Sequence, residues 1–207
     1  MNELLERYPQ LGICKNSIEK AVEKIVKCYE NGGKVLICGN GGSCADSDHI
    51  VGELMKGFLK KRPIPPAKQS EMKSKCPELS DEALRGLQGA LPAISLCSLT
   101  ALNTAFSNDV DPNLIYAQSV YGLGRENDVF IGISTSGNAF NVYYAACVAR
   151  SLGMTVIGLT GKDGGKLKDV SDICVIAPEN ETYKIQELHL PIYHYICAAV
   201  EAHFFDK

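Results

Sequence analysis

The sequence lacks the features of a membrane or secreted protein. No apolar stretch reaches the roughly 18 residues that are needed to span a bilayer. The N-terminal segment MNELLERYPQ has no basic region followed by an apolar one, so it does not resemble a signal peptide. We therefore expect a cytoplasmic protein.

The charge balance also lacks any excess that would favour a polyanionic partner. The 207 residues include 21 Lys and Arg against 24 Asp and Glu, which gives a net charge of −3. Proteins that bind nucleic acid or an anionic membrane usually carry a basic patch. We expect neither as a partner. The remaining composition, 45% hydrophobic and 22% charged, is ordinary for one globular domain with a sizeable core.

The nine cysteines lack the arrangement of a disulfide framework. Their number is odd, no CxxC pair occurs, and a chain of this length needs no crosslinks to fold. Several lie in apolar or helical patterns, among them Cys38, Cys97 and Cys174. We interpret the cysteines as small buried side chains that stay reduced.

Short apolar runs alternate with helical patterns along most of the chain. Strands are predicted at about 34–38, 93–96, 129–133, 155–159 and 173–177, and helices at about 18–30, 45–59 and 182–204. Continuous apolar strands between helices predict an α/β fold, a three-layer sandwich with a five-stranded, parallel, doubly wound sheet.

Residues 1–207 are expected to form a single domain with a surface insertion at about 63–91. The insertion begins with the sequence PIPP and continues with a lysine-rich segment. Ser80 can then cap a short helix that runs through Leu87. We interpret this segment as a solvated insertion, with a lid over a site as the alternative.

Two similar loops are the main functional signal. GNGGS, at 39–43, follows the first predicted strand, and STSGN, at 134–138, follows the third. Such turns present N–H groups and hydroxyls at a helix N-terminus, where an anion is favoured. Ligands of parallel sheets bind at the carboxyl ends of strands, so a phosphate pocket is predicted there. Neither loop matches GxGxxG or GxxxxGK[ST], and we expect no nucleotide cofactor.

Two groups of titratable residues lie on predicted helices. His49 and Glu53 are spaced i, i+4 and share a helix face, so they can bind a metal, act as acid and base, or form a surface pair. The last predicted helix carries Gln186, Glu187, His189 and His194. Pro191 lies among these residues and should kink or locally unwind the helix, so ideal angles do not decide which side chains converge. We interpret His203 as structural.

The motifs, taken together and in order, resemble the sugar isomerase (SIS) family and, within it, the phosphoheptose isomerases. The matching segments lie between about 33 and 194 and read VLICGNGGS, HIVGEL, SND, GISTSGN, VIGLTGKDGG and IQELH, followed by His194. The resemblance implies an aldose–ketose isomerase that converts sedoheptulose 7-phosphate to D-glycero-D-manno-heptose 7-phosphate through an enediol. It also implies a role in supplying heptose precursors for cell-surface glycans.

The resemblance also implies a role for each matching position. Glu53 would be the base and His194 the acid, or the group that moves a proton between O1 and O2. The implied substrate-binding residues are Asn40, Gly41, Gly42, Ser43, Asn108, Asp109, Ser134, Thr135, Ser136, Asn138 and Gln186. A zinc ion, one per subunit, would be held by His49, Glu53, Gln186 and His194. The family further implies a homotetramer with active sites between subunits.

Three departures from the family pattern concern the substrate. Ala139 stands where a serine is common, Gly57 where an arginine is usual, and Tyr183 where an aspartate is usual. Lys56, Lys60 or Lys61 could supply the missing charge. Two alternatives follow: an isomerase for another sugar phosphate, or a SIS sugar-phosphate-binding regulatory module without catalysis. Because Glu53, Gln186 and His194 are all present, an enzyme is favoured.

Overall fold

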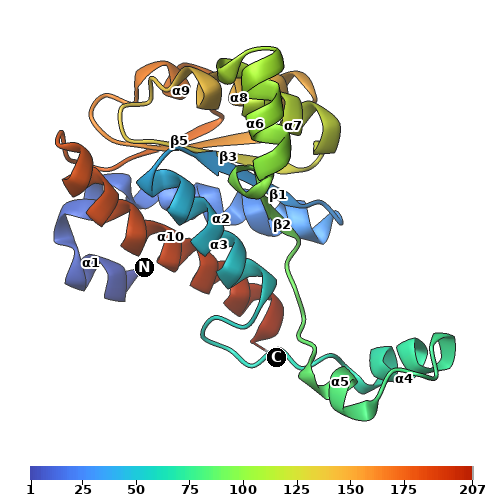
Figure 1. Cartoon of the computed structure of the whole chain (residues 1–207). Coiled ribbons are helices and arrows are strands. Elements are labelled where there is room, and N and C mark those ends of the chain that lie inside the picture. Colours follow the sequence, from blue (N-terminus) through green and yellow to red (C-terminus); the bar gives the residue numbers. More distant parts are fainter. Residues whose placement is uncertain (207) are drawn as a thin grey trace.

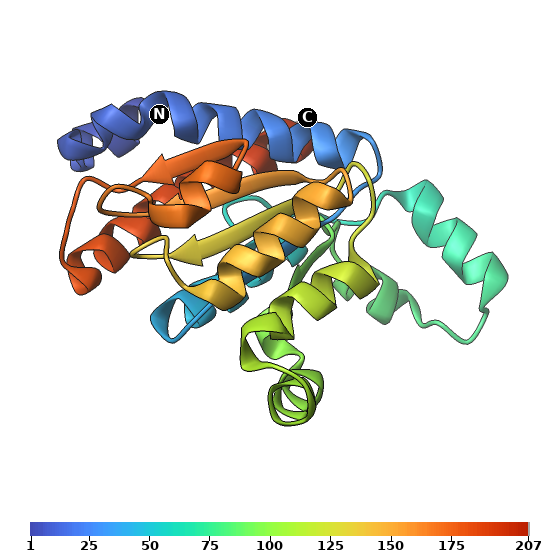
Figure 2. The ribbon, with the colours of Figure 1, turned by 90° about the horizontal axis from the view of Figure 1, so that it is seen from above.

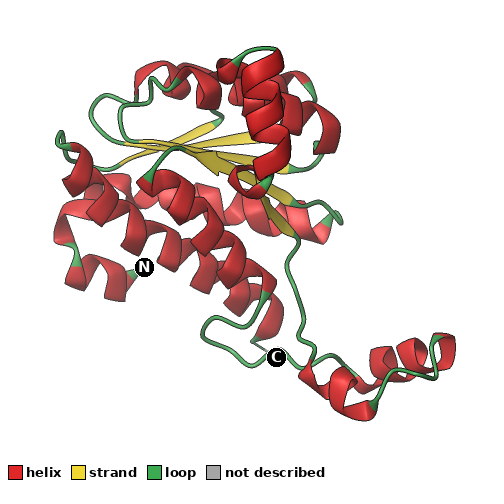
Figure 3. Ribbon diagram, viewed as in Figure 1, coloured by secondary structure: helices red, strands yellow, loops and turns green. Residues whose placement is uncertain are grey.

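The computed structural model describes residues 1–206, which form a three-layer α/β sandwich around a five-stranded parallel sheet (Figures 1 and 3). The strand order is β2-β1-β3-β4-β5. The strands are β1 (Val35–Gly39), β2 (Ala93–Ser95), β3 (Val129–Ser134), β4 (Thr155–Thr160) and β5 (Ile173–Ile176). Every residue of β1 and β3 is buried, which explains their uninterrupted apolar runs. The predicted fold class is confirmed.

Helices cover both faces of the sheet (Figures 1 and 2). One face carries α1 (Asn2–Arg7), α2 (Lys15–Glu30), α3 (Gly42–Met55) and α10 (Thr182–Phe205). The other carries α6 (Thr100–Asp109), α7 (Ile115–Leu123), α8 (Phe140–Ser151) and α9 (Gly165–Val170). Side chains of a strand alternate between the two faces, so Val35 and Ile37 join one core while Leu36 and Cys38 join the other. Short 3-10 helices lie at Pro9–Cys14, Leu96–Ser98 and Pro112–Leu114.

Residues 63–91 form an arm that extends away from the sandwich and carries α4 (Pro66–Lys75) and α5 (Asp81–Gly86) (Figures 1 and 2). The ten residues of α4 are all described, and none of them is buried. Ser80 caps α5 as predicted, because its Oγ accepts a hydrogen bond from the N–H of Ala83 at 3.0 Å. An isolated bridge between Pro63 and Gln88 joins the two ends of the arm. The arm therefore leaves and rejoins the domain at one place.

Some predicted boundaries and burials need correction. The helix predicted at 45–59 is α3, which begins at Gly42 because the glycine turn leads directly into it, and ends at Met55 because Lys56 is extended. Helix α10 runs through Pro191 without interruption, so no local unwinding occurs. The ring of Pro191 is buried, and packing compensates for the hydrogen bond that proline cannot make.

The cysteine prediction holds for pairing and only partly for burial. None of the nine cysteines, all within the described residues, forms a disulfide. Cys38 is buried in a central strand. Cys97, in the 3-10 helix that follows edge strand β2, and Cys174, in edge strand β5, are half-buried, and Cys76 is exposed on the arm. Among residues 1–206, no helix combines the length and apolar character that a membrane crossing requires.

Candidate active site

The two loops identified in the sequence lie side by side. Strands β1 and β3 are neighbours, with Gly39 paired to Ile133, so both loops leave the same edge of the sheet. Between them lies an open cavity of about 360 Å³. Its lining residues are Asn40, Gly41, Gly42, Ser43, Ile133, Ser134, Thr135, Ser136, Ala139, Thr182 and Gln186. The cavity thus gathers eight predicted substrate-binding residues from three separate segments, and adds Thr182, which the sequence did not single out.

The first loop requires glycine. Gly41 has a φ of 56°, which favours glycine, and it immediately precedes the first residue of α3. A Cβ on Gly42 would lie 2.5 Å from Nε2 of Gln186, so a side chain at position 42 would displace that amide. This close approach lets the backbone of α3 and the amide of Gln186 form one wall of the cavity. The N-terminus of α3, where partial positive charge favours an anion, lies at this wall of the cavity.

The second loop is held rigidly by its own hydrogen bonds. The N–H of Gly137 donates to the carbonyl of Ser134 at 2.9 Å, and Gly137 has a φ of 66°. The amide of Asn138 donates to Ser136 O at 2.9 Å and accepts from the N–H of Lys166 at 3.2 Å. Asn138 therefore connects two loops and is not among the residues that line the cavity.

Helix α8, which follows the second loop, begins without a side-chain cap. Ala139 occupies the N-cap position of α8, and its side chain has no oxygen to accept a hydrogen bond from the first turn. Ala139 also lines the cavity. The N–H groups of the first turn of α8 therefore have no acceptor in the side chain of residue 139. This turn lies beside the hydroxyls of Ser134, Thr135 and Ser136.

Asn40 is fixed by a residue that the sequence analysis missed. Its amide exchanges two hydrogen bonds with the amide of Asn141, at 2.8 and 2.9 Å, across the two loops. The hydroxyl of Tyr116 donates to Gly39 O at 2.8 Å, just before Asn40. No local sequence signal relates positions 40 and 141, because their contact depends on the pairing of β1 with β3.

A second group of predicted residues meets farther along α3 and α10. Nε2 of His49 lies 3.2 Å from Oε1 of Glu53, and the ring centroids of His49 and His194 are 5.0 Å apart. Nε2 of His194 is buried and has no hydrogen-bond partner among the described residues. Burial of the ring, and secondly the proximity of His49, lower the pKa of His194, while Glu53 opposes the shift. The imidazole of His194 is therefore neutral near pH 7.

Two further residues orient His49. The hydroxyl of Tyr193 lies 3.0 Å from Nδ1 of His49 and donates to Oδ1 of Asp46 at 3.2 Å. Burial raises the pKa of Asp46, although the bond from Tyr193 works against this. The ring of Phe58 covers His194, with a centroid distance of 5.5 Å. The i, i+3 spacing of Asp46 and His49 could have indicated that these two residues share a face of α3. No sequence pattern indicated the contacts of Tyr193 or Phe58.

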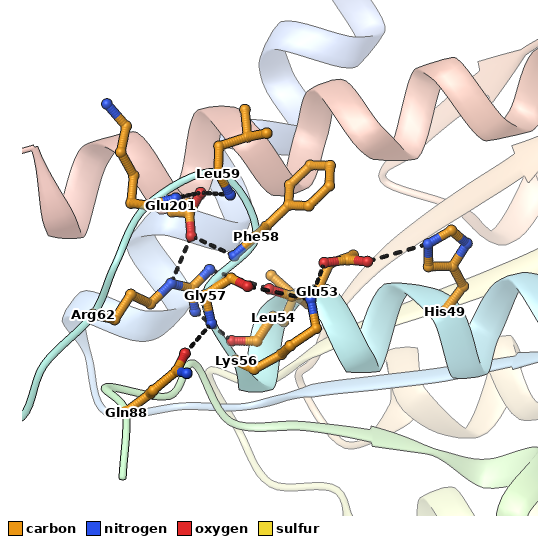
Figure 4. Close-up of polar contacts among 11 residues, drawn as sticks. His49, Glu53, Leu54, Lys56, Gly57, Phe58, Leu59, Arg62, Gln88 and Glu201 are labelled. Atoms are coloured by element: carbon orange, nitrogen blue, oxygen red, sulfur yellow. Dashed lines mark hydrogen bonds and ion pairs between the residues drawn. The ribbon is translucent and has the colours of Figure 1, made fainter. Parts of the chain in front are cut away.

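Lys56, one of the three candidate lysines, contacts the carboxylate of Glu53, the proposed base. Nζ of Lys56 is 2.8 Å from Oε2 of Glu53 (Figure 4). Lys60 instead pairs with Asp206 at 2.5 Å. Lys56 is therefore the lysine placed to balance the charge of Glu53, at the position just before Gly57.

The residues that the resemblance assigns to zinc are not gathered in one place. His49, Glu53 and His194 have suitable donor atoms. Gln186, however, lies against Gly42, about 12 Å along the axis of α10 from His194. Within residues 1–206, no three His, Cys, Asp or Glu side chains are arranged to hold a metal ion. The described conformation therefore does not fit the four-ligand site.

Asn108 and Asp109 lie apart from the cavity. They end α6 on the exposed surface, where the amide of Asn108 donates to Oδ1 of Asp109 at 2.8 Å. Neither residue lines the cavity of its own chain. Their predicted contact with substrate therefore stays a prediction.

The arrangement suits an extended ligand with an anionic end. His49 follows Gly42 by seven residues, about 10 Å along α3, and Glu53 is one turn farther. Helices α3 and α10 pack side by side along this length. A phosphate held at the two loops would place the other end of a long sugar chain toward Glu53 and His194.

Comparison with known proteins gives consistent matches. The SIS domain family pattern matches residues 2–85 and 88–161. The phosphoheptose isomerase of Helicobacter hepaticus is 39% identical over 186 residues, which cover 90% of this chain and 82% of that protein. The phosphoheptose isomerase of Clostridium acetobutylicum is 38% identical, over 99% and 91% of the two chains. The solved structure of the phosphoheptose isomerase from Neisseria gonorrhoeae superposes with a TM-score of 0.76 at 31% identity, covering 97% of this chain and 94% of that one.

Proposed function

The chain belongs to the SIS domain family, and we propose that it is a phosphoheptose isomerase. In this role it interconverts sedoheptulose 7-phosphate and D-glycero-D-manno-heptose 7-phosphate. The observation that carries the proposal is the placement of a carboxylate and two imidazoles beyond a hydroxyl-lined cavity, on the same pair of helices. The rise along α3 from Gly42 is about 10 Å to His49 and about 16 Å to Glu53, which favours an open-chain sugar longer than a triose.

The phosphate is proposed to bind between the two loops. Ser134, Thr135 and Ser136 supply hydroxyls, and the N-termini of α3 and α8 supply N–H groups with partial positive charge. This contact holds the substrate by the end that does not react. The binding energy then serves to fix C1 and C2 relative to the acid and base.

Glu53 is proposed as the base that moves a proton between C1 and C2. Its carboxylate lies between His49 and Lys56, with Oε1 3.2 Å from Nε2 of His49 and Oε2 2.8 Å from Nζ of Lys56. His194, which is neutral near pH 7, is proposed to exchange a proton with O1 and O2. The two groups together form and collapse the enediol. Each well-placed acid or base contributes on the order of 10²–10⁴-fold to such a rate.

Zinc stays a prediction from the resemblance, and no step above depends on it. To complete the four-ligand set, Lys56 would have to leave Glu53, and Gln186 would have to move from Gly42. A bound zinc would polarise a substrate carbonyl. Metal analysis of the purified protein and of its His49→Ala variant tests the prediction.

A homotetramer with sites between subunits is also part of the proposal. Asn108 and Asp109 do not line the cavity between the two loops of their own chain, which supports their use by a neighbouring copy. Exposed apolar side chains on α6 and just after it, Leu102 and Val110, give such a contact something to bury. Nine unpaired cysteines are compatible with a reducing compartment, which supports placing the enzyme in the cytoplasm.

The proposed reaction is tested by incubating the purified protein with sedoheptulose 7-phosphate and following the products by NMR. Formation of the heptose 7-phosphate is expected. A panel of shorter ketose phosphates tests the alternative raised by Ala139, Gly57 and Tyr183, namely a different sugar phosphate. Tight binding of a sugar phosphate without turnover of any of them would instead identify a regulatory binding module.

A further inference from the structure

A buried ion pair lies directly behind the last turn of α3 (Figure 4). Nε of Arg62 is 2.8 Å from Oε1 of Glu201, and both side chains are fully shielded from solvent. Charges are rarely buried unless they are paired and hydrogen-bonded, because leaving water is costly. Arg62 lies at the base of the arm and Glu201 lies near the end of α10. Neither residue belongs to the loops or to the acid–base group described above.

Arg62 binds the open end of α3. The last four carbonyls of a helix have no partner within the helix. Here Nη1 of Arg62 donates to the carbonyl of Leu54 at 2.8 Å, and Nη2 donates to that of Glu53 at 3.1 Å. A cation at this end also opposes the negative end of the helix dipole. The guanidinium therefore holds the backbone of the residue that carries the proposed base.

Glu201 holds the segment that follows α3. Its Oε1 accepts from the N–H of Phe58 at 2.8 Å, and its Oε2 accepts from those of Leu59 and Lys60 at 2.7 and 3.1 Å. Burial alone raises the pKa of Glu201, but these N–H groups and Arg62 bring the pKa below its usual value. Glu201 therefore stays ionised, and each of its two carboxylate oxygens accepts two hydrogen bonds.

The segment held by Glu201 leads back to the proposed acid. The ring of Phe58 packs against the ring of His194, and the N–H of Phe58 is one of the groups bound by Glu201. The same ion pair therefore restrains Glu53 through its carbonyl and His194 through Phe58. No other contact among the described residues links the surroundings of both groups in this way through one buried pair.

We propose that Arg62 and Glu201 are positioning residues for the isomerisation, which keep the Glu53 carboxylate and the His194 imidazole in a fixed position relative to each other. This inference rests on the proposed function. A displacement of about 1 Å in a catalytic group can reduce a rate on the order of 10²-fold. Loss of the pair should therefore lower kcat while leaving KM nearly unchanged, because the phosphate loops lie elsewhere.

Three variants test the proposal. Arg62→Lys keeps the charge but cannot donate to two carbonyls and Glu201 in one plane, so kcat should fall about 10-fold. Glu201→Gln keeps the shape and loses the charge. The double variant Arg62→Met/Glu201→Met replaces the pair by apolar side chains, a change that often preserves stability, and kcat should fall on the order of 100-fold. In each case KM should stay within about threefold of the original value.

A matched control lies at the amino ends of β1 and β3. Asp128, which is also buried, pairs with Lys34 at 2.6 Å and accepts from the backbone N–H groups of Lys34 and Arg125, and none of these bonds reaches Glu53 or His194. Asp128→Asn should lower the melting temperature without changing kcat. It thus shows what the loss of a purely structural buried carboxylate does in this fold.

The outcomes separate the two proposals. If the original protein does not turn over the heptose phosphate, the proposed function fails. If it does, and the folded variants at Arg62 and Glu201 keep kcat within twofold, only the positioning role is overturned. The same holds if kcat falls no more than in an Asp128→Asn protein of equal melting temperature. Should the double variant not fold, the two single variants decide.

Discussion

At the scale of single residues, Glu53 and His194 are neighbours in different electrostatic surroundings. Glu53 contacts the ring of His49 through one carboxylate oxygen and the ammonium group of Lys56 through the other. His194 is enclosed by aromatic rings, and its burial lowers the pKa of the imidazole. A carboxyl group and a neutral imidazole in one site can together move protons on carbon and on oxygen in one cycle.

Ala139 provides a test of the phosphate loop at this scale. Ala139→Ser adds a hydroxyl at the N-cap of α8, beside the cavity. We expect the free energy of unfolding to rise by about 1 kcal/mol, and the KM for the phosphorylated sugar to fall. Chemical denaturation and steady-state kinetics measure the two effects. Ala67→Ser, at an exposed position of α4, is the control. An unchanged KM would place the phosphate elsewhere.

At the scale of elements, α10 is the helix that connects the site to the sheet. Its His189 is fully buried, and Nε2 of this residue lies 3.0 Å from the carbonyl of Thr160 at the end of β4. Burial lowers the pKa of His189 to about 4. The contact between α10 and β4 thus depends on a histidine that remains neutral.

This contact predicts how stability depends on pH. The unfolded chain protonates His189 near pH 6.5, whereas the folded chain does so near pH 4. The unfolded state therefore binds more protons between these values, and stability is lost as the pH falls from 6.5 to 4. The contribution of His189 is roughly 3 kcal/mol.

His189→Gln should remove this part of the loss, because glutamine can still donate to Thr160 and does not titrate. Urea unfolding of both proteins at pH 7, 5.5 and 4.5 measures the difference. If both proteins lose the same free energy of unfolding over this range, His189 is protonated in the fold or does not matter.

The strands and loops could be predicted from the sequence, whereas the long-range contacts could not. The five strands and the two loops followed from apolar runs and glycine turns, since both are local patterns. The pairing of Asn40 with Asn141 and of Arg62 with Glu201 did not, because each joins residues more than a hundred positions apart. The early end of α3 was missed for the same reason. Its open carbonyls are bound by Arg62, whose position only the folded arm defines.

At the scale of the whole molecule, the cavity of one chain contains most of the predicted binding residues, and the surface of the chain presents the others. Asn108 and Asp109 end an exposed helix, and the arm of residues 63–91 extends beyond the sandwich (Figure 1). A monomer with these features leaves apolar and polar groups available for a second copy.

Mixing inactive variants tests whether subunits share a site. Glu53→Gln removes the base, and Asn108→Ala/Asp109→Ala removes the proposed contact from a neighbour. If sites lie between subunits, mixed oligomers formed by co-refolding should regain part of the activity, because some sites combine two intact halves. Activity equal to the sum of the separate proteins would contradict shared sites. Size-exclusion chromatography with light scattering shows whether mixed oligomers form.

The central claim, that Glu53 moves a proton on carbon through an enediol, is tested most directly by proton exchange with solvent. Sedoheptulose 7-phosphate is incubated with the protein in D₂O, and NMR follows deuterium at C1 of the ketose and C2 of the aldose. We predict deuterium at both carbons with the original protein and none with Glu53→Gln, although the variant still binds the substrate. Deuterium incorporation that persists at the original rate in Glu53→Gln would contradict the account.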